Sequence, residues 1–309
     1  MMSIHNNKRI ISFADSIKES FEQSIKKDKN VFLMGEGIDD PSSMWGTTKG
    51  IAKKYGKDKI LEMPVAENGL IGAAIGASYL GSRPVINLQR VEFSFLALEQ
   101  ILNNAAKSSY LSLGKHNVPI VLRMVIGRGW GQGPQHSQSV ESLFASIPGL
   151  KVVMPTFPYE AKGLMNASIR DNNPVIFIEH RWTHHTLGYV PKKYYLQNLD
   201  GPILTHRGND LTIVSTSYST IEALEVCKFL KKHKINVDLY NLCVIKPLNL
   251  DKIVKSVAKT KRLITIDTGH RLFGIGSEII SQIAEKNFKF NVKYSKLGLQ
   301  DHPTPSSRG

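Results

Sequence analysis

Two side chains in the first half of the chain are suited to acid–base chemistry, Glu67 and His136. Glu67 follows a short strand end, residues 63–65, and begins a helix rich in glycine and alanine. A carboxyl group in a site with little water can hold or share a proton near neutral pH. The alternative is an ordinary glutamate at a helix start, where the helix dipole favours a negative charge.

His136 lies in the glycine-rich stretch GRGWGQGPQHSQS, residues 127–139. Glycines let the backbone approach a ligand closely, and the flanking amides and hydroxyls can orient the imidazole ring. This stretch follows an expected strand, as do Glu67 and Gln89. In an open parallel sheet, ligands bind beyond the carboxyl ends of the strands, so these residues can share one site. A histidine in an ordinary loop is the alternative.

The elements that must position these residues alternate between strand and helix, which predicts an α/β fold with a doubly wound, mainly parallel sheet. After residue 185 the pattern lapses, and it then resumes as a second, smaller α/β unit. We therefore expect a first domain at 1–185, a linker at 186–208 and a second domain at 209–309. The expected elements of the first domain include helix 8–28, strand 30–37, strand 83–89, helix 93–114, strand 118–127 and strand 173–180.

The composition is that of a globular protein of 309 residues, long enough for two compact domains. The formal net charge is +14, but the lysines are scattered over expected outer helix faces, so we expect no nucleic-acid partner. No apolar run is long enough to cross a bilayer and no signal peptide is visible, so we expect no membrane association and a cytoplasmic location. Cys227 and Cys243 match no metal-binding spacing, and a reducing compartment fits them best.

Several common catalytic motifs are missing. The sequence contains no P-loop and no visible Ser–His–Asp elbow. It also lacks the Gly-Asp-Gly motif, followed by a downstream Asn, that usually holds a magnesium diphosphate. Glu67 and His136 therefore remain the strongest candidates for chemistry.

Six segments together resemble the beta subunit of the 2-oxo acid dehydrogenase decarboxylase component, a subunit shared by pyruvate, branched-chain and acetoin dehydrogenases. They are PVAENGLIGAAIGASYLGSRPV, QILNNAAKSSYLSLG, GPQHSQS, PGLKVVMP, EAKGLMNASIRDNNPV and DHPTP. They occur in the family's order over residues 8–305, so the resemblance is specific for the family and weak for the substrate. It implies a thiamine-diphosphate enzyme of the transketolase superfamily, with a pyrimidine-binding domain followed by a transketolase C-terminal domain.

The resemblance also implies roles for individual residues. Glu67 matches the family glutamate that hydrogen-bonds the aminopyrimidine ring of the cofactor, and Phe93 matches the aromatic residue stacked on that ring. Val65 and Gln89 match neighbours of the same ring. His136 matches the histidine that faces the substrate and its intermediates. Glu67 and His136 would therefore be the catalytic pair.

In this family the alpha subunit carries the magnesium and the diphosphate-binding motif, which explains why that motif is missing here. The resemblance therefore implies an alpha subunit partner and an alpha2beta2 heterotetramer, with the cofactor bound between chains. Some family members also bind a structural potassium ion. The matching residues, which would use mostly backbone oxygens, are Ile120, Ser168, Ile169, Asp171 and Asn173. A simple turn at these residues is the alternative.

The implied reaction is decarboxylation of a 2-oxo acid, with formation of a cofactor-bound enamine and transfer of the acyl group to a lipoyl acceptor on an acyltransferase. Two other functions stay open. The chain could belong to a carboligase that transfers the enamine to an aldehyde or sugar acceptor, or it could be a non-catalytic scaffold subunit. The presence of Glu67, Phe93 and His136 together argues against the scaffold.

The sequence departs from the family pattern in two places. Arg181, Trp182, His184 and His185 stand where most relatives have a short aliphatic or tyrosine segment. They could reach the mouth of the site, although an interface patch is the simpler interpretation. The chain also ends soon after Pro305, earlier than typical relatives, so docking on an acyltransferase core is an open question.

Overall fold

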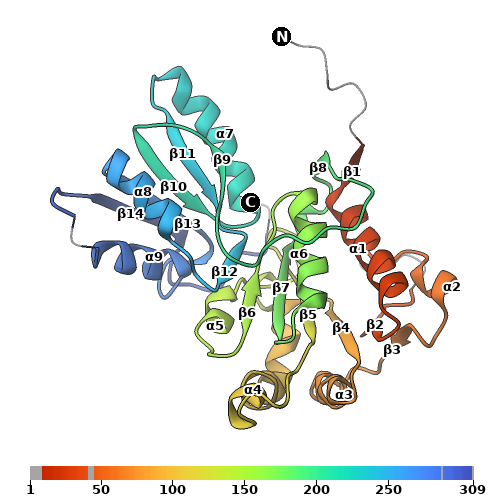
Figure 1. Cartoon of the computed structure of the whole chain (residues 1–309). Helices are drawn as coiled ribbons and strands as arrows, with labels where there is room; N and C mark the ends of the chain where they lie inside the picture. Colours follow the sequence, from red (N-terminus) through yellow and green to blue (C-terminus); the bar gives the residue numbers. More distant parts are fainter. Residues whose placement is uncertain (1–8, 41–44, 287, 308–309) are drawn as a thin grey trace.

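The computed structural model describes residues 9–40, 45–286 and 288–307, which form two α/β units with one main sheet each (Figure 1). The first sheet has seven strands in the order β12-β6-β7-β5-β4-β2-β3. All of its neighbouring strands run parallel except β12 and β6. Its strands are β2 (Val31–Gly35), β3 (Ile60–Glu62), β4 (Arg83–Leu88), β5 (Val121–Ile126), β6 (Lys151–Val153), β7 (Val175–His180) and β12 (Val244–Lys246).

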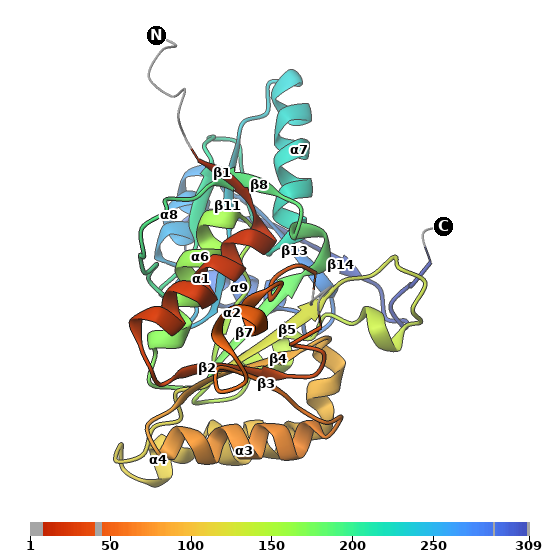
Figure 2. The same ribbon diagram turned by 90° about the vertical axis from the view of Figure 1, so that its right-hand side faces the viewer.

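Helices cover both faces of this sheet, as Figure 2 shows, with α3 and α4 below it and α1 and α6 above it. The two faces have separate apolar cores, because strand side chains alternate between them. This arrangement confirms the expected doubly wound, mainly parallel sheet. The helices are α1 (Phe13–Lys27), α2 (Ile51–Tyr55), α3 (Glu67–Tyr79), α4 (Ser108–Leu111), α5 (Glu141–Ala145) and α6 (Pro158–Arg170).

The first helix begins later than expected. Residues Ile10–Ser12 form strand β1, which pairs with β8 (Leu187–Tyr189), and α1 starts at Phe13. The side chain of Ser12 accepts a hydrogen bond from the Asp15 backbone N–H, so it caps α1. Residue 8, where we expected the helix to begin, lies outside the described residues.

The single helix expected at 93–114 was also wrong. The chain there forms a 3-10 helix η1 (Val91–Ala97), a π-helix η2 (Gln100–Ala105) and then α4. Local side-chain bonds favour the break, since Ser94 Oγ donates to the Val91 carbonyl and Asn104 donates to Glu99. Such helix irregularities are frequent next to functional sites.

The second unit has a five-stranded sheet in the order β14-β13-β10-β11-β9. The segment expected as a linker, 186–208, is not plain coil, since it contributes β8 to the pair with β1 and β9 to this sheet. Strand β12 crosses back to pair with β6 of the first sheet, which ties the two units together. The elements are β9 (Ile203–His206), β10 (Leu211–Ser215), α7 (Tyr218–Lys232), β11 (Val237–Asn241), α8 (Asp251–Thr260), β13 (Arg262–His270), α9 (Ile275–Ala284) and β14 (Lys293–Leu299).

Within the described part of the chain, no helix has the length and apolar character that crossing a membrane would require. Both cysteines are buried free thiols. Two further 3-10 turns, η3 (Gln135–Ser137) and η4 (Arg181–Thr183), lie beyond the carboxyl ends of β5 and β7. They belong to the loops that form the site.

Candidate active site

Glu67 is the first residue of α3, and only 3% of it is exposed. Its Oε1 atom is buried and has no hydrogen-bond partner among the described residues. Buried carboxylate oxygens are almost always paired, because leaving one unpaired costs folding free energy. An exception at the carboxyl edge of the sheet therefore points to a ligand that supplies the missing partner.

A second carboxylate lies near Glu67, and the sequence reasoning missed it. Glu36 directly follows β2, and its Oε1 is also buried without a partner in the described chain. Burial, and then the negative charges of Glu67 and Glu62, raise the pKa of Glu36. Its position at the end of a parallel strand was the available signal. The raised pKa lets Glu36 hold a proton more readily than an ordinary glutamate does.

His136 is held by a third carboxylate. Its Nδ1 lies 2.5 Å from Oε1 of Glu92, whose side chain is only 8% exposed, whereas that of His136 is 39% exposed. The backbone carbonyl of His136 also accepts a hydrogen bond from Arg90 Nη1 at 2.6 Å. A carboxylate on one ring nitrogen fixes the ring orientation and leaves the other nitrogen for substrate. Glu92 was not among our candidates, although it precedes Phe93 directly.

The remaining cofactor candidates lie along the same edge. The Phe93 ring lies 5.6 Å, centroid to centroid, from the His136 ring, so the structure brings these two together. Gln89 donates from Nε2 to the Glu36 carbonyl at 3.2 Å, and it supports the turn after β2. Val65 is 80% exposed just before α3. Since η1, which contains Phe93, packs against α3, which begins at Glu67, the elements that carry these two side chains are neighbours.

Comparison with known proteins identifies the family of the chain. Residues 10–184 match the family described as "Transketolase, pyrimidine binding domain", and residues 201–309 match "Transketolase, C-terminal domain". The chain is 37% identical over 292 residues to "Pyruvate dehydrogenase E1 component subunit beta" of Gracilaria tenuistipitata var. liui, with 94% of this chain and 90% of that protein covered. The chain belongs to this beta-subunit family.

Two further comparisons support the assignment. The "Acetoin:2,6-dichlorophenolindophenol oxidoreductase subunit beta" of Bacillus subtilis (strain 168) is also 37% identical to this beta-subunit chain, over 97% of the chain and 91% of that protein. A solved structure titled "Split gene transketolase, inactive beta4 tetramer" superposes with a TM-score of 0.78 over 94% of this chain and 89% of that one. Its 18% identity supports the fold alone.

The unusual segment of this beta subunit, 181–185, does not act as one group. Arg181 is buried between two indole rings, 3.6 Å from the Trp45 centroid and 3.4 Å from that of Trp130. Its Nη1 donates to Gln132 Oε1 at 3.1 Å. Burial, and then the charge of Arg90, lower the pKa of Arg181 to about 10. This stack joins three loops at the carboxyl edge of the sheet.

His184 belongs to a different cluster, in the core of the first unit. Its Nε2 lies 2.8 Å from Glu179 Oε2, and Arg123 donates to the same carboxylate at 2.6 and 2.8 Å. Burial alone would raise the pKa of Glu179, but the charge and hydrogen bonds of Arg123, with those of His184, hold it at about 2. His185 is exposed, and Trp182 lines a separate cleft described below.

Two positively charged side chains, Arg83 and Lys151, donate hydrogen bonds to oxygens of residues that we expected to bind potassium. Arg83 Nη1 donates to the carbonyls of Ile169 and Asp171 at 3.1 and 2.9 Å, and Lys151 donates to the Asp171 carboxylate. Among the described residues, no group of three or more His, Cys, Asp or Glu side chains is placed to hold a metal ion. The potassium site at Ile120, Ser168, Ile169, Asp171 and Asn173 stays a prediction.

Proposed function

We propose that this chain is the beta subunit of a thiamine-diphosphate-dependent 2-oxo acid dehydrogenase that transfers its acyl group to a lipoyl acceptor. The observation that carries this proposal is the buried, unpartnered Oε1 of Glu67 at the carboxyl edge of the first sheet. Its relatives are named as dehydrogenase and oxidoreductase beta subunits, and its first unit matches a pyrimidine-binding domain.

The residues of this chain fit the aminopyrimidine end of thiamine diphosphate. Glu67 would bind a ring nitrogen of the aminopyrimidine and share a proton with it, and the nearby Glu36, whose pKa is raised, would be a second group able to take that proton. Phe93 would pack on the ring, with Val65 and Gln89 beside it. When bound, thiamine diphosphate supplies the electron sink for decarboxylation of a 2-oxo acid.

His136 would act on the substrate side. Because Nδ1 is bound by Glu92, Nε2 is the nitrogen that can move a proton or stabilise negative charge on the reacting molecule. Glu92 would keep the ring in that orientation throughout turnover. This chain would thus contribute one group that faces the cofactor and one that faces the substrate.

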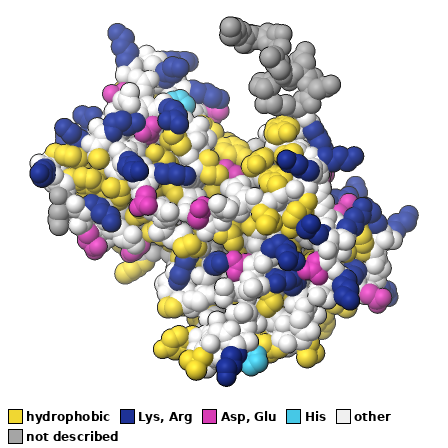
Figure 3. All heavy atoms as spheres, viewed as in Figure 1, with side chains coloured by type: hydrophobic (Ala, Val, Ile, Leu, Met, Phe, Trp, Pro, Cys, Tyr) yellow, Lys and Arg dark blue, Asp and Glu magenta, His cyan; other side chains and the backbone are white. Residues whose placement is uncertain are grey.

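A partner chain is needed for the other end of the cofactor. Exposed apolar side chains lie on and around α3, with Val65, Leu80 and Leu96 at 80%, 90% and 63% exposure. Figure 3 shows several hydrophobic side chains exposed at the lower end of the molecule, where α3 and α4 lie. Exposed apolar surface of this kind marks interaction sites. We place an alpha subunit here, carrying the magnesium and the diphosphate-binding motif, in an alpha2beta2 assembly.

The test is reconstitution with an alpha-type subunit from the same organism. We expect thiamine diphosphate to bind only to the two-chain complex. We also expect oxidation of a 2-oxo acid to require a lipoyl acyltransferase, and to yield NADH when the NAD-dependent component of the multienzyme complex is added. Decarboxylation that needs an added aldehyde instead would move the assignment to a carboligase. If the complex forms but binds no thiamine diphosphate, the catalytic proposal fails and the scaffold is left.

A further inference from the structure

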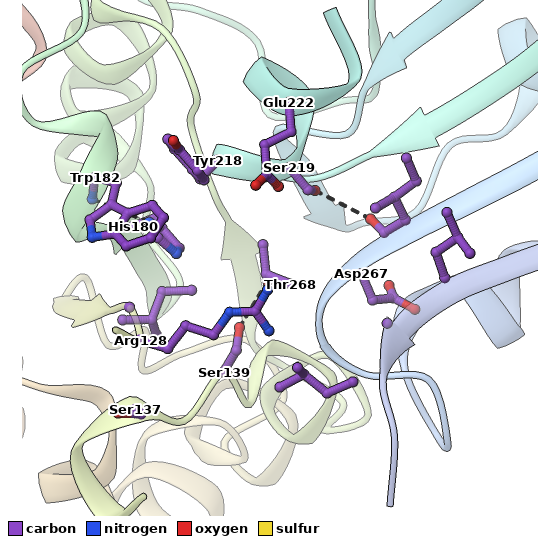
Figure 4. Close-up of a pocket in the computed structure, with 16 residues that line it drawn as sticks. Arg128, Ser137, Ser139, His180, Trp182, Tyr218, Ser219, Glu222, Asp267 and Thr268 are labelled. Carbon is purple, nitrogen blue, oxygen red and sulfur yellow. Dashed lines mark hydrogen bonds between the residues drawn. The ribbon is translucent and has the colours of Figure 1, made fainter. Parts of the chain in front are cut away.

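A polar cleft lies between the two units, and neither Glu67 nor His136 is among the residues that line it. It opens where β5 and β7 of the first sheet end and where β10 of the second sheet leads into α7 (Figure 4). The carboxyl edges of parallel strands are the usual ligand sites of α/β folds, and here two such edges meet. The cleft holds about 230 Å³, less than the roughly 300–1,000 Å³ of a drug-sized ligand site, so its occupant is small.

His180 supplies a buried hydrogen-bond donor on the wall of this cleft. The residue is only 7% exposed, and its Nδ1 accepts a hydrogen bond from the Trp182 backbone N–H at 3.2 Å. Burial, and then the positive charges of Arg128 and His184, lower the pKa of His180 to about 3. The ring is therefore neutral, with its proton on Nε2. The only hydrogen bond of the ring among the described residues is the one at Nδ1, so the Nε2–H is left for a ligand.

Two further sources of positive potential converge on the same cleft. The guanidinium of Arg128 extends into it, and the described residues include no carboxylate in an ion pair with it (Figure 4). The fifteen-residue helix α7 points its N-terminus at the cleft, and the side chain of its N-cap residue Ser217 makes no capping hydrogen bond. Free N–H groups at a helix start favour an anion.

The opposite wall adds an acceptor and an aromatic surface. The Glu222 carboxylate faces the cleft from the start of α7 and has no hydrogen-bond partner in the described chain. The Tyr218 ring stacks on His180 at 5.1 Å and meets Trp182 edge-on at 5.0 Å. A ligand must therefore place an acidic group near Arg128 and His180 and a hydrogen-bond donor near Glu222, with its carbon atoms against the rings.

We propose that this interdomain cleft is a binding site for a small oxyanion that carries a neighbouring hydroxyl group, either a phosphate ester or a hydroxy carboxylate. His180 and Arg128 bind the oxyanion with the N-terminus of α7, and Glu222 accepts from the hydroxyl. The site is independent of the thiamine diphosphate chemistry proposed above. Its nearest link to that chemistry is the loop 127–139, because Ser137 and Ser139 line the cleft on either side of Gln138, and Ser137 adjoins His136.

Calorimetric titration of the full chain tests the proposal, alone and with its partner chain. The probes are glycerol 3-phosphate, D-glycerate, inorganic phosphate and glycerol. We expect saturable binding of one of the first two, with phosphate and glycerol each about tenfold weaker or worse, since each lacks one of the two contacts. The preference between the first two distinguishes a phosphate ester from a carboxylate. R128Q should weaken binding by about tenfold, because it removes a charge-assisted contact.

Matched variants separate this site from general attraction to a basic protein. R207Q removes one exposed positive charge outside the cleft and should leave the affinity unchanged. E222Q should reduce the advantage of glycerol 3-phosphate or glycerate over phosphate. The proposal is overturned if neither probe binds, if R207Q weakens binding as much as R128Q, or if the partner chain abolishes binding by covering the cleft. None of these readouts depends on turnover, so the dehydrogenase proposal can fail or stand separately.

Discussion

Two glutamates of the first unit are both buried, but only one of them has partners for its carboxylate oxygens within the described chain. Glu179, in β7, is fully buried and has a guanidinium and an imidazole on its two oxygens. Glu67, at the start of α3, is 3% exposed and leaves Oε1 without a partner in the described chain. A buried charge that the chain itself compensates supports folding, whereas one left uncompensated costs stability unless a ligand or partner completes it. The comparison thus separates an acid whose partners lie within the chain from an acid that leaves one oxygen for a ligand or partner.

The largest effect should come from breaking the compensated pair. In R123M, Glu179 would keep its burial and lose its cation, so we expect a loss of about 3–5 kcal/mol in the free energy of unfolding. Urea denaturation followed by circular dichroism measures this loss. The double variant R123M/E179Q removes the stranded charge and should recover part of the stability. If R123M is as stable as the wild type, Glu179 does not depend on its cation and the comparison fails.

The uncompensated acid should show the opposite pattern. E67Q keeps the shape of the side chain but cannot share a proton with a bound ring nitrogen, so we expect turnover of the reconstituted enzyme to fall by about 10²–10⁴-fold. The unfolding free energy should not fall, since no intramolecular bond of the buried Oε1 is lost. Steady-state kinetics and thermal melts measure the two effects. Near-normal turnover would remove Glu67 from the mechanism.

Glu92 lies between these extremes, because it has a partner and that partner is the candidate catalytic histidine. E92Q retains a group that can accept from Nδ1–H but lacks the charge, and we expect kcat to fall by about tenfold with KM little changed. E92L should cost more, since it removes the acceptor as well. Nitrogen NMR of labelled His136 reports the tautomer directly.

The NMR measurement separates positioning from support of the fold. A single Nδ1–H tautomer should give way to a mixture in E92L, while far-ultraviolet circular dichroism stays unchanged. If kcat falls in both variants with the tautomer unaltered, Glu92 acts only through the local fold.

The sequence predicted the features that depend on local pattern, namely the two sheets and the edge where the site residues lie. The strand–helix alternation predicted both sheets. The positions of Glu67, Gln89 and the loop 127–139, each after an expected strand, led us to expect them along one edge of the first sheet. These features are predictable because periodicity and strand order place residues without reference to side-chain partners.

Other features depended on contacts that no local pattern contains. The helix expected at 93–114 breaks into 3-10, π and α segments because Ser94 and Asn104 find local partners. His184 appeared to be part of a surface motif, but its ring packs 5.6 Å from Phe13 and bonds to Glu179 in the core. Glu36 and Glu92 were missed since a carboxylate reveals its role only through the group beside it.

The smallest expected effect is a change of stability with pH, and it concerns a third buried acid, Asp267. Its carboxylate has hydrogen-bond partners, unlike Oε1 of Glu67, but among the described residues it lacks the cation that Glu179 has. It accepts hydrogen bonds from the Gly276 N–H at 3.0 and 3.2 Å but has no cation in an ion pair within the described chain. Burial, and then the nearby Glu141, raise its pKa to about 7, from an ordinary value of 3.8. The folded protein therefore holds a proton that the unfolded chain has already released, and this contribution to stability is lost as pH rises through about 7.

We therefore expect Asp267 to lower the unfolding free energy of the wild type by about 1 kcal/mol between pH 6 and pH 8. D267N should lack this decrease. Parallel urea titrations at the two pH values measure the difference, with the exposed Glu285→Gln as a control for general charge effects. If the unfolding free energy of D267N decreases as much as that of the wild type, another acid causes the pH dependence. If the wild type instead gains stability over this range, Asp267 is compensated like Glu179, and hydrogen bonds without a cation are enough to stabilise a buried carboxylate.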